Sequence, residues 1–336
     1  MIRVAIVGAT GYTGLELIRI LLRHPSVQIT HLTSRDPQSP HLSEVHPSLR
    51  DQLDLNLIPL DVEEIGTQCD AVFCCLPHAA SAEIISQLMN HDVRIVDFSA
   101  DYRLTELQTF EDWYRVKHPD PQRLGSVPYG IPELFGSEIK DAKLVANPGC
   151  FPSSALLPLA PLLKAGLIDD TPIIVDSKTG VSGAGRKSKL AFHYPECNES
   201  TKAYGVGTHR HMPEIDSVIK RFSARTIECI FTPHVVSMDR GILSTIYVRT
   251  KDNVDADKAW NNLNDFYSDQ PFIRVTETLP ATKDVSGSNF CDIAVRQSRD
   301  TLVIVSALDN LIKGASGAAV QNFNLMFGFE QTTALL

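Results

Sequence analysis

The stretch IRVAIVGATGYTGLELIRILL, residues 2–22, decides the fold. Residues 2–7 are apolar apart from Arg3 and predict a buried strand. Apolar residues then recur at helical spacing, at Leu15, Leu17, Ile18, Leu21 and Leu22. A turn with three glycines separates the strand from the helix. This succession predicts the first unit of a parallel sheet that binds a dinucleotide.

Each glycine of this turn has a physical role in such a unit. Gly8 allows the tight turn, Gly11 lets the backbone approach a pyrophosphate, and Gly14 lets the helix pack closely on the strand. The phosphates would lie at the positive end of the helix dipole. The spacing is GxxGxxG rather than GxGxxG, so a purely structural turn is the alternative. The turn residues predicted to bind the cofactor are Gly8, Thr10, Gly11, Tyr12, Thr13 and Gly14.

The end of the second predicted strand, residues 27–34, indicates which cofactor binds. An NAD site usually ends this strand with Asp or Glu on the ribose hydroxyls, whereas an arginine suits the extra phosphate of NADP. Here the strand ends in Thr33, Ser34 and Arg35, and Asp36 comes one residue late. We therefore expect NADP, bound by Ser34 and Arg35, with NAD still possible and a solvated surface charge as the alternative for Arg35.

Three further apolar runs, residues 70–76, 93–98 and 143–146, predict that the parallel sheet continues. A helix is expected over residues 79–90, and a polar excursion over residues 36–57. The carboxyl ends of parallel strands line the ligand crevice of such sheets. The turns after these strands, including residues 99–103 (SADYR), should therefore face a ligand.

A second signature follows the last of these runs, NPGCFPSS at residues 147–154. The segment Ser153–Ala165 predicts a helix despite its prolines, so Cys150 lies at or just before a helix N-terminus. Backbone N–H groups there favour an anion, which would stabilise a thiolate and also an oxyanion. Cys150 is therefore a candidate nucleophile for an acyl carbon, with a buried structural cysteine as the alternative.

After Cys150 the pattern changes to long alternating strands. They are predicted at residues 172–177, 226–237, 241–249, 272–276, 291–297 and 301–307, with helices at 215–221 and 256–267. The predicted fold is α/β, a Rossmann doubly wound parallel sheet with a second, mostly antiparallel α+β domain. The first domain should comprise residues 1–147 with the small-residue terminal helix 311–336, and the second residues 148–310. One face of the second sheet should be free, which favours a homodimer or homotetramer.

Composition limits the classes of partner. The 336 residues are 43% hydrophobic and 21% charged, as in a globular protein with two cores. A net charge of −9 without a basic stripe argues against nucleic acid, and no apolar run is long enough to span a membrane. The seven cysteines are scattered without a CxxC pair, so we expect reduced thiols, no metal and a cytoplasmic location.

The segment THRHMPE, residues 208–214, supplies the proton chemistry that a cysteine nucleophile needs. A histidine suits both proton acceptance and donation at neutral pH. We favour His211 as the acid/base, because Glu214 lies three residues on and could orient it, and His209 for substrate contact. Their i, i+2 spacing predicts that only one of them reaches Cys150. The alternative is a pair of structural hydrogen-bonding histidines.

The motifs GATGYTG, SADYRL, NPGC, HRHMPE and DNLIKGASGAAVQN occur in this order. The chain thereby resembles the N-acetyl-gamma-glutamyl-phosphate reductase family, relatives of aspartate-semialdehyde and glyceraldehyde-3-phosphate dehydrogenases, over essentially its whole length. The resemblance implies NADPH-dependent reduction of N-acetyl-L-glutamyl 5-phosphate to the 5-semialdehyde with release of phosphate, in arginine biosynthesis. It implies that Cys150 forms a thioester that hydride then reduces.

The resemblance also implies roles for further residues. Ser182 and Gly183 resemble the family's loop near the nicotinamide, and Asn310 and Lys313 its terminal cofactor contact. A substrate with a carboxylate and an acyl phosphate needs cationic contacts. The predicted substrate-binding residues are Arg103, Asn147, Lys178, Arg186, Arg210 and Glu214. Each cation among them could instead be a surface charge.

Two other functions stay open from the sequence. One is a reductase for a different acyl phosphate, aspartyl or aminoadipyl, because pocket depth sets substrate length. The other is a non-catalytic NADP-sensing regulator that keeps the fold, against which the presence of Cys150, His209 and His211 argues.

Overall fold

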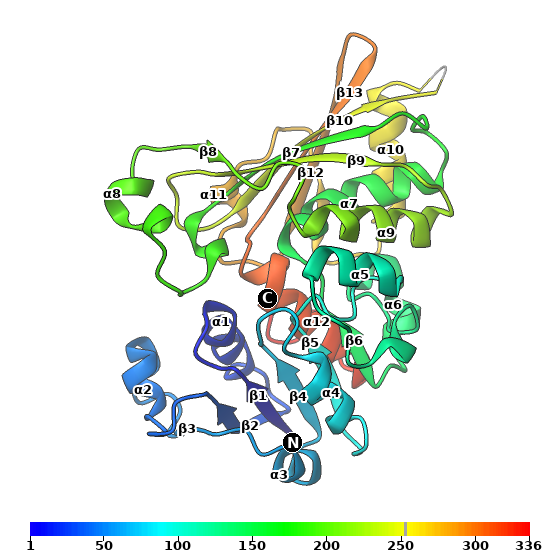
Figure 1. The fold of residues 1–336 in the computed structure, drawn as a ribbon. Coiled ribbons are helices and arrows are strands. Elements are labelled where there is room, and N and C mark those ends of the chain that lie inside the picture. The colour runs from blue at the N-terminus through cyan, green and yellow to red at the C-terminus, as the bar shows by residue number, and fades with distance from the viewer. Residues whose placement is uncertain (252–253) are drawn as a thin grey trace. The chain divides into compact units, whose positions relative to one another are not determined.

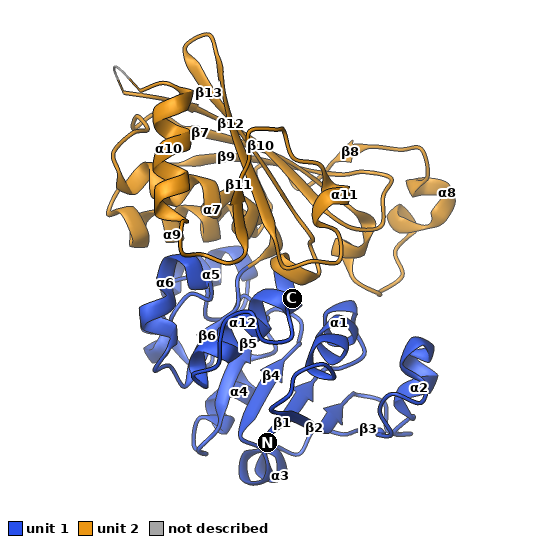
Figure 2. Cartoon of the chain, turned by 180° about the vertical axis from the view of Figure 1, so that it is seen from behind, with its two compact units in different colours: residues 1–148, 315–336 blue, residues 149–314 orange. Residues whose placement is uncertain are grey.

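The computed structural model describes residues 1–251 and 254–336. The chain forms two compact units (Figure 2). Unit 1 comprises Met1–Pro148 and Ala315–Leu336, and unit 2 comprises Gly149–Gly314.

Unit 1 is built on a six-stranded sheet in the order β3-β2-β1-β4-β5-β6 (Figure 1). The strands are β1 (Ile2–Val7), β2 (Val27–Thr33), β3 (Leu57–Ile58), β4 (Ala71–Cys74), β5 (Arg94–Asp97) and β6 (Leu144–Ala146). All five neighbouring pairs are parallel. This is the strand order of dinucleotide-binding sheets, and it reverses direction between β1 and β4. The prediction of a Rossmann sheet is confirmed.

The helices of unit 1 are α1 (Tyr12–Leu21), α2 (Leu42–Val45), α3 (Val62–Gln68), α4 (Ala82–Leu88), α5 (Leu107–Tyr114), α6 (Pro132–Ile139) and α12 (Gly317–Met326), with 3-10 turns at Pro47–Leu49 and Pro121–Arg123. The terminal helix α12 packs on α1, α6 and β5. Buried asparagine side chains of α12 also form hydrogen bonds with other parts of unit 1. Asn322 Nδ2 donates to Gly130 O at 2.9 Å, and Asn324 Oδ1 lies 3.1 Å from His24 Nε2. Residues far apart in the sequence therefore build one core.

Unit 2 contains a seven-stranded sheet in the order β11-β12-β13-β10-β7-β9-β8. The strands are β7 (Ile173–Thr179), β8 (Lys202–Ala203), β9 (Cys229–Val235), β10 (Ile242–Arg249), β11 (Ile273–Val275), β12 (Cys291–Ser298) and β13 (Thr301–Leu308). The pairs β7–β9 and β11–β12 are parallel, and the others are antiparallel. The prediction of a second, mostly antiparallel sheet is confirmed.

The helices of unit 2 are α7 (Cys150–Lys164), α8 (Tyr194–Cys197), α9 (His211–Ser223), α10 (Ala256–Phe266) and α11 (Thr282–Val285), with 3-10 turns at Val181–Ala184 and Leu190–Phe192 and a π turn at Ile312–Ser316. Helix α7 packs on β10 and β13 and against α9 and α10. Residues of β7 and β9 alternate between buried and more exposed positions, so one face of the sheet is covered and the other is open.

Beyond its first turn helix α7 contains two prolines, Pro158 and Pro161, each of which removes an N–H that would bond the carbonyl four residues earlier. The two carbonyls concerned belong to Ser154 and Leu157. Donors from elsewhere in unit 2 bond both of them. Ser306 Oγ donates to Ser154 O at 2.6 Å, and the Tyr267 hydroxyl donates to Leu157 O. The sequence tolerates prolines in this helix because the surrounding fold supplies the missing bonds.

A row of buried serines lies beneath the first turns of α7. Ser177, Ser244 and Ser306 are register neighbours across β7, β10 and β13. Ser244 Oγ lies 2.7 Å from Ser177 Oγ and 2.7 Å from Ser154 Oγ on the helix. All four serines are fully buried. Their small side chains let the helix approach the sheet closely. The hydroxyls of Ser154, Ser177 and Ser244 bond to one another, and that of Ser306 bonds to the Ser154 carbonyl.

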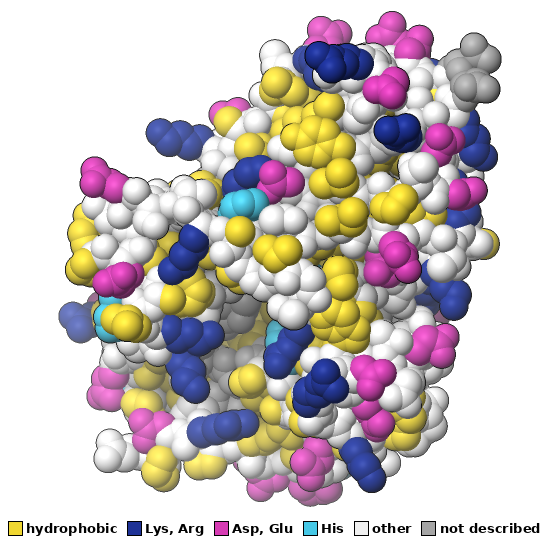
Figure 3. Space-filling model, turned by 45° about the horizontal axis from the view of Figure 1, so that its top comes forward, with side chains coloured by type: hydrophobic (Ala, Val, Ile, Leu, Met, Phe, Trp, Pro, Cys, Tyr) yellow, Lys and Arg dark blue, Asp and Glu magenta, His cyan; other side chains and the backbone are white. Residues whose placement is uncertain are grey.

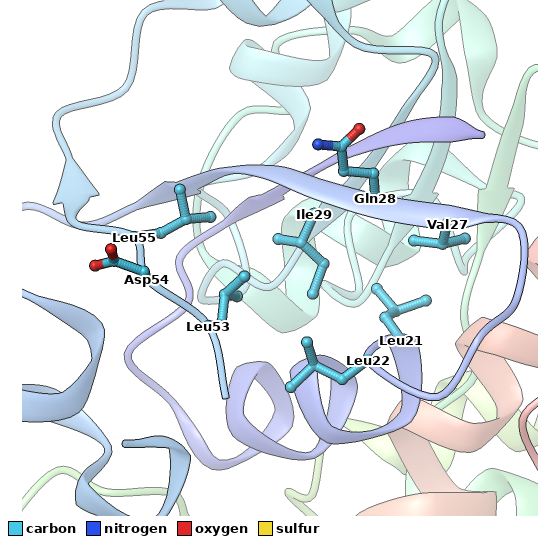
Figure 4. Close-up of a pocket in the computed structure, with 8 residues that line it drawn as sticks. All are labelled: Leu21, Leu22, Val27, Gln28, Ile29, Leu53, Asp54 and Leu55. Carbon is cyan, nitrogen blue, oxygen red and sulfur yellow. The ribbon is translucent and has the colours of Figure 1, made fainter. Parts of the chain in front are cut away.

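A pocket of about 350 Å³ lies outside the predicted sites. It opens between the end of α1, β2 and the segment 53–55, and none of the predicted site residues lines it (Figure 4).

Over residues 1–251 and 254–336, none of the helices has the length and apolar character that crossing a membrane requires.

Candidate active site

Cys150 is the first residue of α7, with Gly149 as the N-cap. The helix therefore begins three residues earlier than the predicted Ser153, and the cysteine lies at the helix N-terminus as expected. The N-cap glycine has no side chain of its own with which to cap this end. Because Pro152 has no N–H and Ser153 N bonds to Gly149 O at 2.9 Å, the first-turn amides not used by the helix belong to Cys150 and Phe151. These amides favour negative charge at this point.

Glu214 joins this N-terminus to the N-terminus of α9. Its carboxylate is 1% exposed, and Oε1 accepts a hydrogen bond from Gly149 N at 2.9 Å. Its second oxygen, Oε2, lies 4.0 Å from Nε2 of His211, the first residue of α9. One buried carboxylate thus bonds beside the cysteine and faces the histidine, which supports the predicted orienting role.

His209 is held in one tautomer. Its Nδ1 accepts a hydrogen bond from His211 N at 3.1 Å, so the ring proton is on Nε2. Burial, and then the charge of Arg210, lowers the pKa of His209 to about 4. The ring is neutral near pH 7 and presents an N–H donor. This suits contact with a substrate oxygen better than proton abstraction.

The rings of both histidines pack against that of Phe151, the residue after Cys150. The Phe151 ring centre lies 5.7 Å from that of His209 and 5.9 Å from that of His211, and the two imidazoles are 4.9 Å apart. The two rings lie together because His209 precedes the first residue of α9, His211. That only one of them reaches Cys150 stays a prediction. The ring centre of Tyr204 lies 5.5 Å from that of His209. Burial, and then the charge of the nearby Cys150, raises the pKa of Tyr204.

The sequence analysis missed Phe151 and Tyr204 as parts of this site. The signal was present in their positions, because Phe151 directly follows the cysteine and Tyr204 opens the glycine-containing turn before His209. No group of three or more metal-binding side chains occurs in the described part of the chain.

The glycine turn of unit 1 has the geometry of a phosphate cradle. Gly8 has a φ of +85°, and a Cβ there would lie 2.7 Å from Cys75 O. A Cβ on Gly14 would lie 2.7 Å from Ala9 O, so both positions require glycine. Gly11 is the N-cap of α1. A Cβ placed on it would meet only Thr13 Oγ1, at 3.8 Å, so there is open space beside this backbone. A pyrophosphate can approach the backbone there.

The electrostatics of this turn also fit an anion. Helix α1 has no side-chain cap and no acidic residue in its first turn. The turn is held from β2, where Thr33 Oγ1 accepts from Gly8 N at 3.2 Å. Thr13 O accepts a hydrogen bond from Ser316 Oγ at 2.8 Å, and Tyr12 is 36% exposed. A dinucleotide therefore fits the predicted residues of unit 1.

The end of β2 carries a cation where an NAD site would carry an acid. Ser34 is buried, and its Oγ accepts from Asp36 N at 3.2 Å. Arg35 is exposed, and its guanidinium has no hydrogen-bond or ion-pair partner among the residues described. This arrangement fits the additional phosphate of NADP.

The remaining residues predicted to contact the cofactor belong to unit 2. Asn310 Oδ1 accepts from Gly241 N at 2.7 Å, and its Nδ2 donates to Ser182 Oγ at 3.0 Å. A Cβ on Gly183 would lie 3.7 Å from the same amide nitrogen, so these predicted residues lie together. Lys313 is 2% exposed, with Nζ 5.7 Å above the Phe272 ring. Their contact with a cofactor stays a prediction.

Two residues predicted to bind substrate hold the backbone of unit 1. Arg103 Nε donates to Asn147 O at 2.8 Å, and its Nη2 donates to Phe98 O at 2.7 Å. The Asn147 amide donates to Ala315 O at 3.0 Å and accepts from Asn322 at 3.1 Å. Both side chains are nearly fully buried. They fix the segment that leads to Cys150, and their contact with substrate stays a prediction.

The other predicted cations differ in their surroundings. Lys178 Nζ lies 2.8 Å from Asp176 Oδ2 on the open face of the unit 2 sheet. Arg186 and Arg210 are exposed, Arg186 in the loop after β7 and Arg210 directly between the two histidines. Of these three cations, Arg210 is the one that the structure brings next to His209 and His211.

Comparison with known proteins agrees with this geometry. Residues 3–142 match the family model described as semialdehyde dehydrogenase, NAD binding domain, and residues 150–310 match semialdehyde dehydrogenase, dimerisation domain. The N-acetyl-gamma-glutamyl-phosphate reductase of Rhodopirellula baltica is 55% identical over 340 aligned residues, covering 100% of this chain and 98% of that protein. The chain belongs to this reductase family.

Other reductases of the family are similar over the same length. That of Citrifermentans bemidjiense is 48% identical and that of Desulforudis audaxviator 45%, each covering 100% of this chain and 98% of the relative. Among solved structures, aspartate semialdehyde dehydrogenase II of Vibrio cholerae, complexed with ASA, has a TM-score of 0.75 at 18% identity, covering 98% of both chains. The Candida albicans aspartate semialdehyde dehydrogenase with NADP has a TM-score of 0.75 at 14% identity, covering 97% of this chain and 98% of that one. The reductase family therefore shares its fold with these dehydrogenases.

Proposed function

We infer that this chain uses NADPH to reduce N-acetyl-L-glutamyl 5-phosphate to N-acetyl-L-glutamate 5-semialdehyde, with release of phosphate, in arginine biosynthesis. The observation that carries the proposal is the position of Cys150 as the first residue of α7, with Glu214 bonded to the N-cap Gly149 and facing His211. Full-length identity of 55% to a reductase of this name supports the choice of substrate.

The first half of the reaction is acyl transfer to Cys150. His211 takes the thiol proton, and the thiolate attacks the acyl carbon. The carbon–sulfur bond forms, the bond from the acyl carbon to the phosphate oxygen breaks, and phosphate leaves with that electron pair. We propose the Nε2–H of His209 and the amide of Phe151 as the donors that stabilise the oxyanion. Glu214 keeps His211 in orientation.

The second half reduces the resulting thioester. Bound NADPH supplies a hydride to the carbonyl carbon. His211 supplies the proton for the oxygen that develops charge and takes it back as the carbon–sulfur bond breaks. The semialdehyde leaves, and the protonated His211 returns its proton to the Cys150 thiolate, which restores the starting state.

The residues that hold the two small molecules are part of the proposal. In unit 1 the glycine turn with Thr10, Tyr12 and Thr13, followed by Ser34 and Arg35, binds NADP; in unit 2 Ser182, Gly183, Asn310 and Lys313 contribute. Arg210 and Arg186 are the better candidates for the substrate's anionic groups, because both are exposed. Arg103, Asn147 and Glu214 are weaker candidates because they are nearly fully buried, and Lys178 is weaker because Asp176 already neutralises its charge.

The decisive test is phosphate-dependent reduction of NADP+ by the purified protein, the reverse reaction. N-acetyl-glutamate semialdehyde and aspartate semialdehyde are compared side by side, with NAD+ as the cofactor control. We expect turnover on the acetylated substrate with NADP+. A preference for aspartate semialdehyde or an aminoadipyl analogue would keep the mechanism and overturn the substrate. NADPH binding without turnover on any of them would favour a regulator.

We propose further that the open face of the unit 2 sheet joins two copies of the chain. Ile174 lies in register with Tyr247 on one side and Ile230 on the other, and the three are 43%, 38% and 52% exposed. A row of apolar side chains on an open sheet favours burial in an interface. Hydrophobic side chains also lie among charged ones in the upper part of Figure 3. The name of the matching family model, dimerisation domain, supports this choice.

Substituting Ile174→Lys is expected to shift the protein from dimer or tetramer to monomer, because a charge would enter the buried row. Leu279→Lys is the matched control, since Leu279 is 58% exposed outside the sheet. Sedimentation at working concentration gives the mass. A monomeric wild-type protein, or an unchanged mass for Ile174→Lys, would contradict the proposed interface. A cytoplasmic location also belongs to the proposal, and the seven free cysteines support it.

A further inference from the structure

The chain forms a π turn at Ile312–Ser316, directly after β13. Within it Gly314 N donates to Asp309 O at 2.9 Å, the five-residue reach that defines this geometry. Single π turns are rare and occur often at functional sites, because they redirect the backbone locally. This turn brings Gly314 against the helix start that carries Cys150.

The contact between Gly314 and Cys150 leaves no room for a side chain. A Cβ placed on Gly314 would lie 2.8 Å from the Cys150 Cβ, 3.2 Å from the Cys150 Cα and 3.3 Å from Asp309 O. All three are atoms of the backbone or directly attached to it, so none can swing away. Position 314 therefore requires glycine, because any side chain there would collide with Cys150.

Asp309 fixes this turn in place. It is fully buried, and its Oδ1 accepts from Leu311 N at 2.8 Å and from Ile312 N at 3.0 Å. Its Oδ2 accepts from Gly287 N at 2.7 Å and lies 3.6 Å from Arg240 Nη1. The backbone that presents Gly314 is thus tied to two other loops of unit 2 by a buried charge.

The rest of the cysteine's helix turn is held from other directions. Glu214 bonds to Gly149 on one side, and the serine row bonds to Ser154 from the sheet. These contacts fix the backbone of the turn. Gly314 lies against the Cβ itself, the atom from which the thiol projects.

We propose that Gly314 is a positioning residue, which by its contact with the Cys150 Cβ fixes the direction in which the sulfur meets the acyl carbon. The proposal rests on the proposed function in one respect, that Cys150 is the nucleophile. It differs from the role that the family resemblance suggests for this segment, which is contact with the cofactor.

The test is Gly314→Ala, with Gly136→Ala as the matched control. A Cβ on Gly136 would have Leu325 Cδ1 as its nearest neighbour at 3.9 Å, so the control adds the same methyl group without a clash. We expect Gly314→Ala to lower kcat about 10- to 100-fold, because a displacement of about 1 Å can cost that much. Alkylation of Cys150 by iodoacetamide should slow, while KM and the Kd for NADPH change less than about threefold. The control should match the wild type.

Three results would overturn the proposal: a kcat within about twofold of wild type, unchanged alkylation, or a loss that appears in the Kd for NADPH instead. If Gly314→Ala fails to fold at working temperature, a thermal double-mutant cycle with Cys150→Gly replaces the kinetics. Removing the Cys150 Cβ should restore most of the melting temperature lost to Gly314→Ala, and an equal loss in both backgrounds would refute the contact. Alkylation and melting need no substrate, so they separate this proposal from the assay of the reaction itself.

Discussion

Cys150→Ser is expected to lower kcat by about 10⁴-fold or more while leaving the Kd for NADPH within about twofold of wild type. The hydroxyl of serine stays protonated where a thiol at a helix N-terminus ionises, so it attacks the acyl carbon far more slowly. A 10⁴-fold loss corresponds to about 5.5 kcal/mol of lost transition-state stabilisation. NADPH binding should survive, because Cys150 is not among the residues proposed to hold the cofactor and the exchange of sulfur for oxygen changes its size little.

Two measurements check this expectation together. Steady-state turnover gives kcat, and quenching of protein fluorescence or calorimetry gives the Kd for NADPH. Cys197→Ser is the matched control, since Cys197 is a partly exposed free thiol to which the mechanism assigns no role. Substantial turnover by Cys150→Ser would remove the thioester from the mechanism. Loss of NADPH binding would mean instead that the substitution disturbs the fold.

His211→Asn is expected to lower kcat by about 10²- to 10³-fold, the contribution of a positioned acid/base. It should also remove the ionisation that shapes the pH dependence of kcat/KM. His209→Gln should lower kcat/KM less, by about tenfold, and keep the shape of the profile. The reason is that the pKa of His209 is lowered to about 4, so this ring is already neutral between pH 5 and 9.

A pH profile of kcat/KM for the three proteins distinguishes the two histidines. If His209→Gln lost the ionisation and His211→Asn kept it, the assignment of acid/base to His211 would be wrong. Stability gives an independent check on His209. Its folded pKa is below the unfolded value, so the unfolded state binds more protons between pH 6.5 and 4, and the free energy of unfolding falls as the pH falls through that range. His209→Gln should remove this part of the dependence.

Local patterns in the sequence were enough to predict the sheet of unit 1. The glycine turn after Ile2–Val7 and the apolar runs that follow are governed by chemistry within about 20 residues. The position of Cys150 at a helix start was predictable for the same reason. The start itself was predicted too late, at Ser153, because prolines within a helix pattern obscure where the helix begins.

Contacts between distant parts of the chain could not be predicted. Glu214 bonds to Gly149 across 65 residues, and Gly314 reaches Cys150 through a π turn that leaves no mark in the periodicity. The spacing of His209 and His211 could not show that both rings pack against Phe151. Lys178 carries the right charge for an anionic substrate, but its neighbour Asp176 on the strand pairs with it. Charge and spacing suggest candidates, and the tertiary fold decides among them.

Pro158 and Pro161 of α7 have a consequence for biosynthesis. The carbonyls that they leave open are bonded by Tyr267 and Ser306, which follow their partners in the chain by 110 and 152 residues. A nascent chain that ends before these donors should not complete the helix, because an isolated segment of 15 residues with three prolines is a poor helix former. We therefore expect the helix start that carries Cys150 to form only after almost the whole polypeptide has left the ribosome. Until then Cys150 should react as an ordinary cysteine.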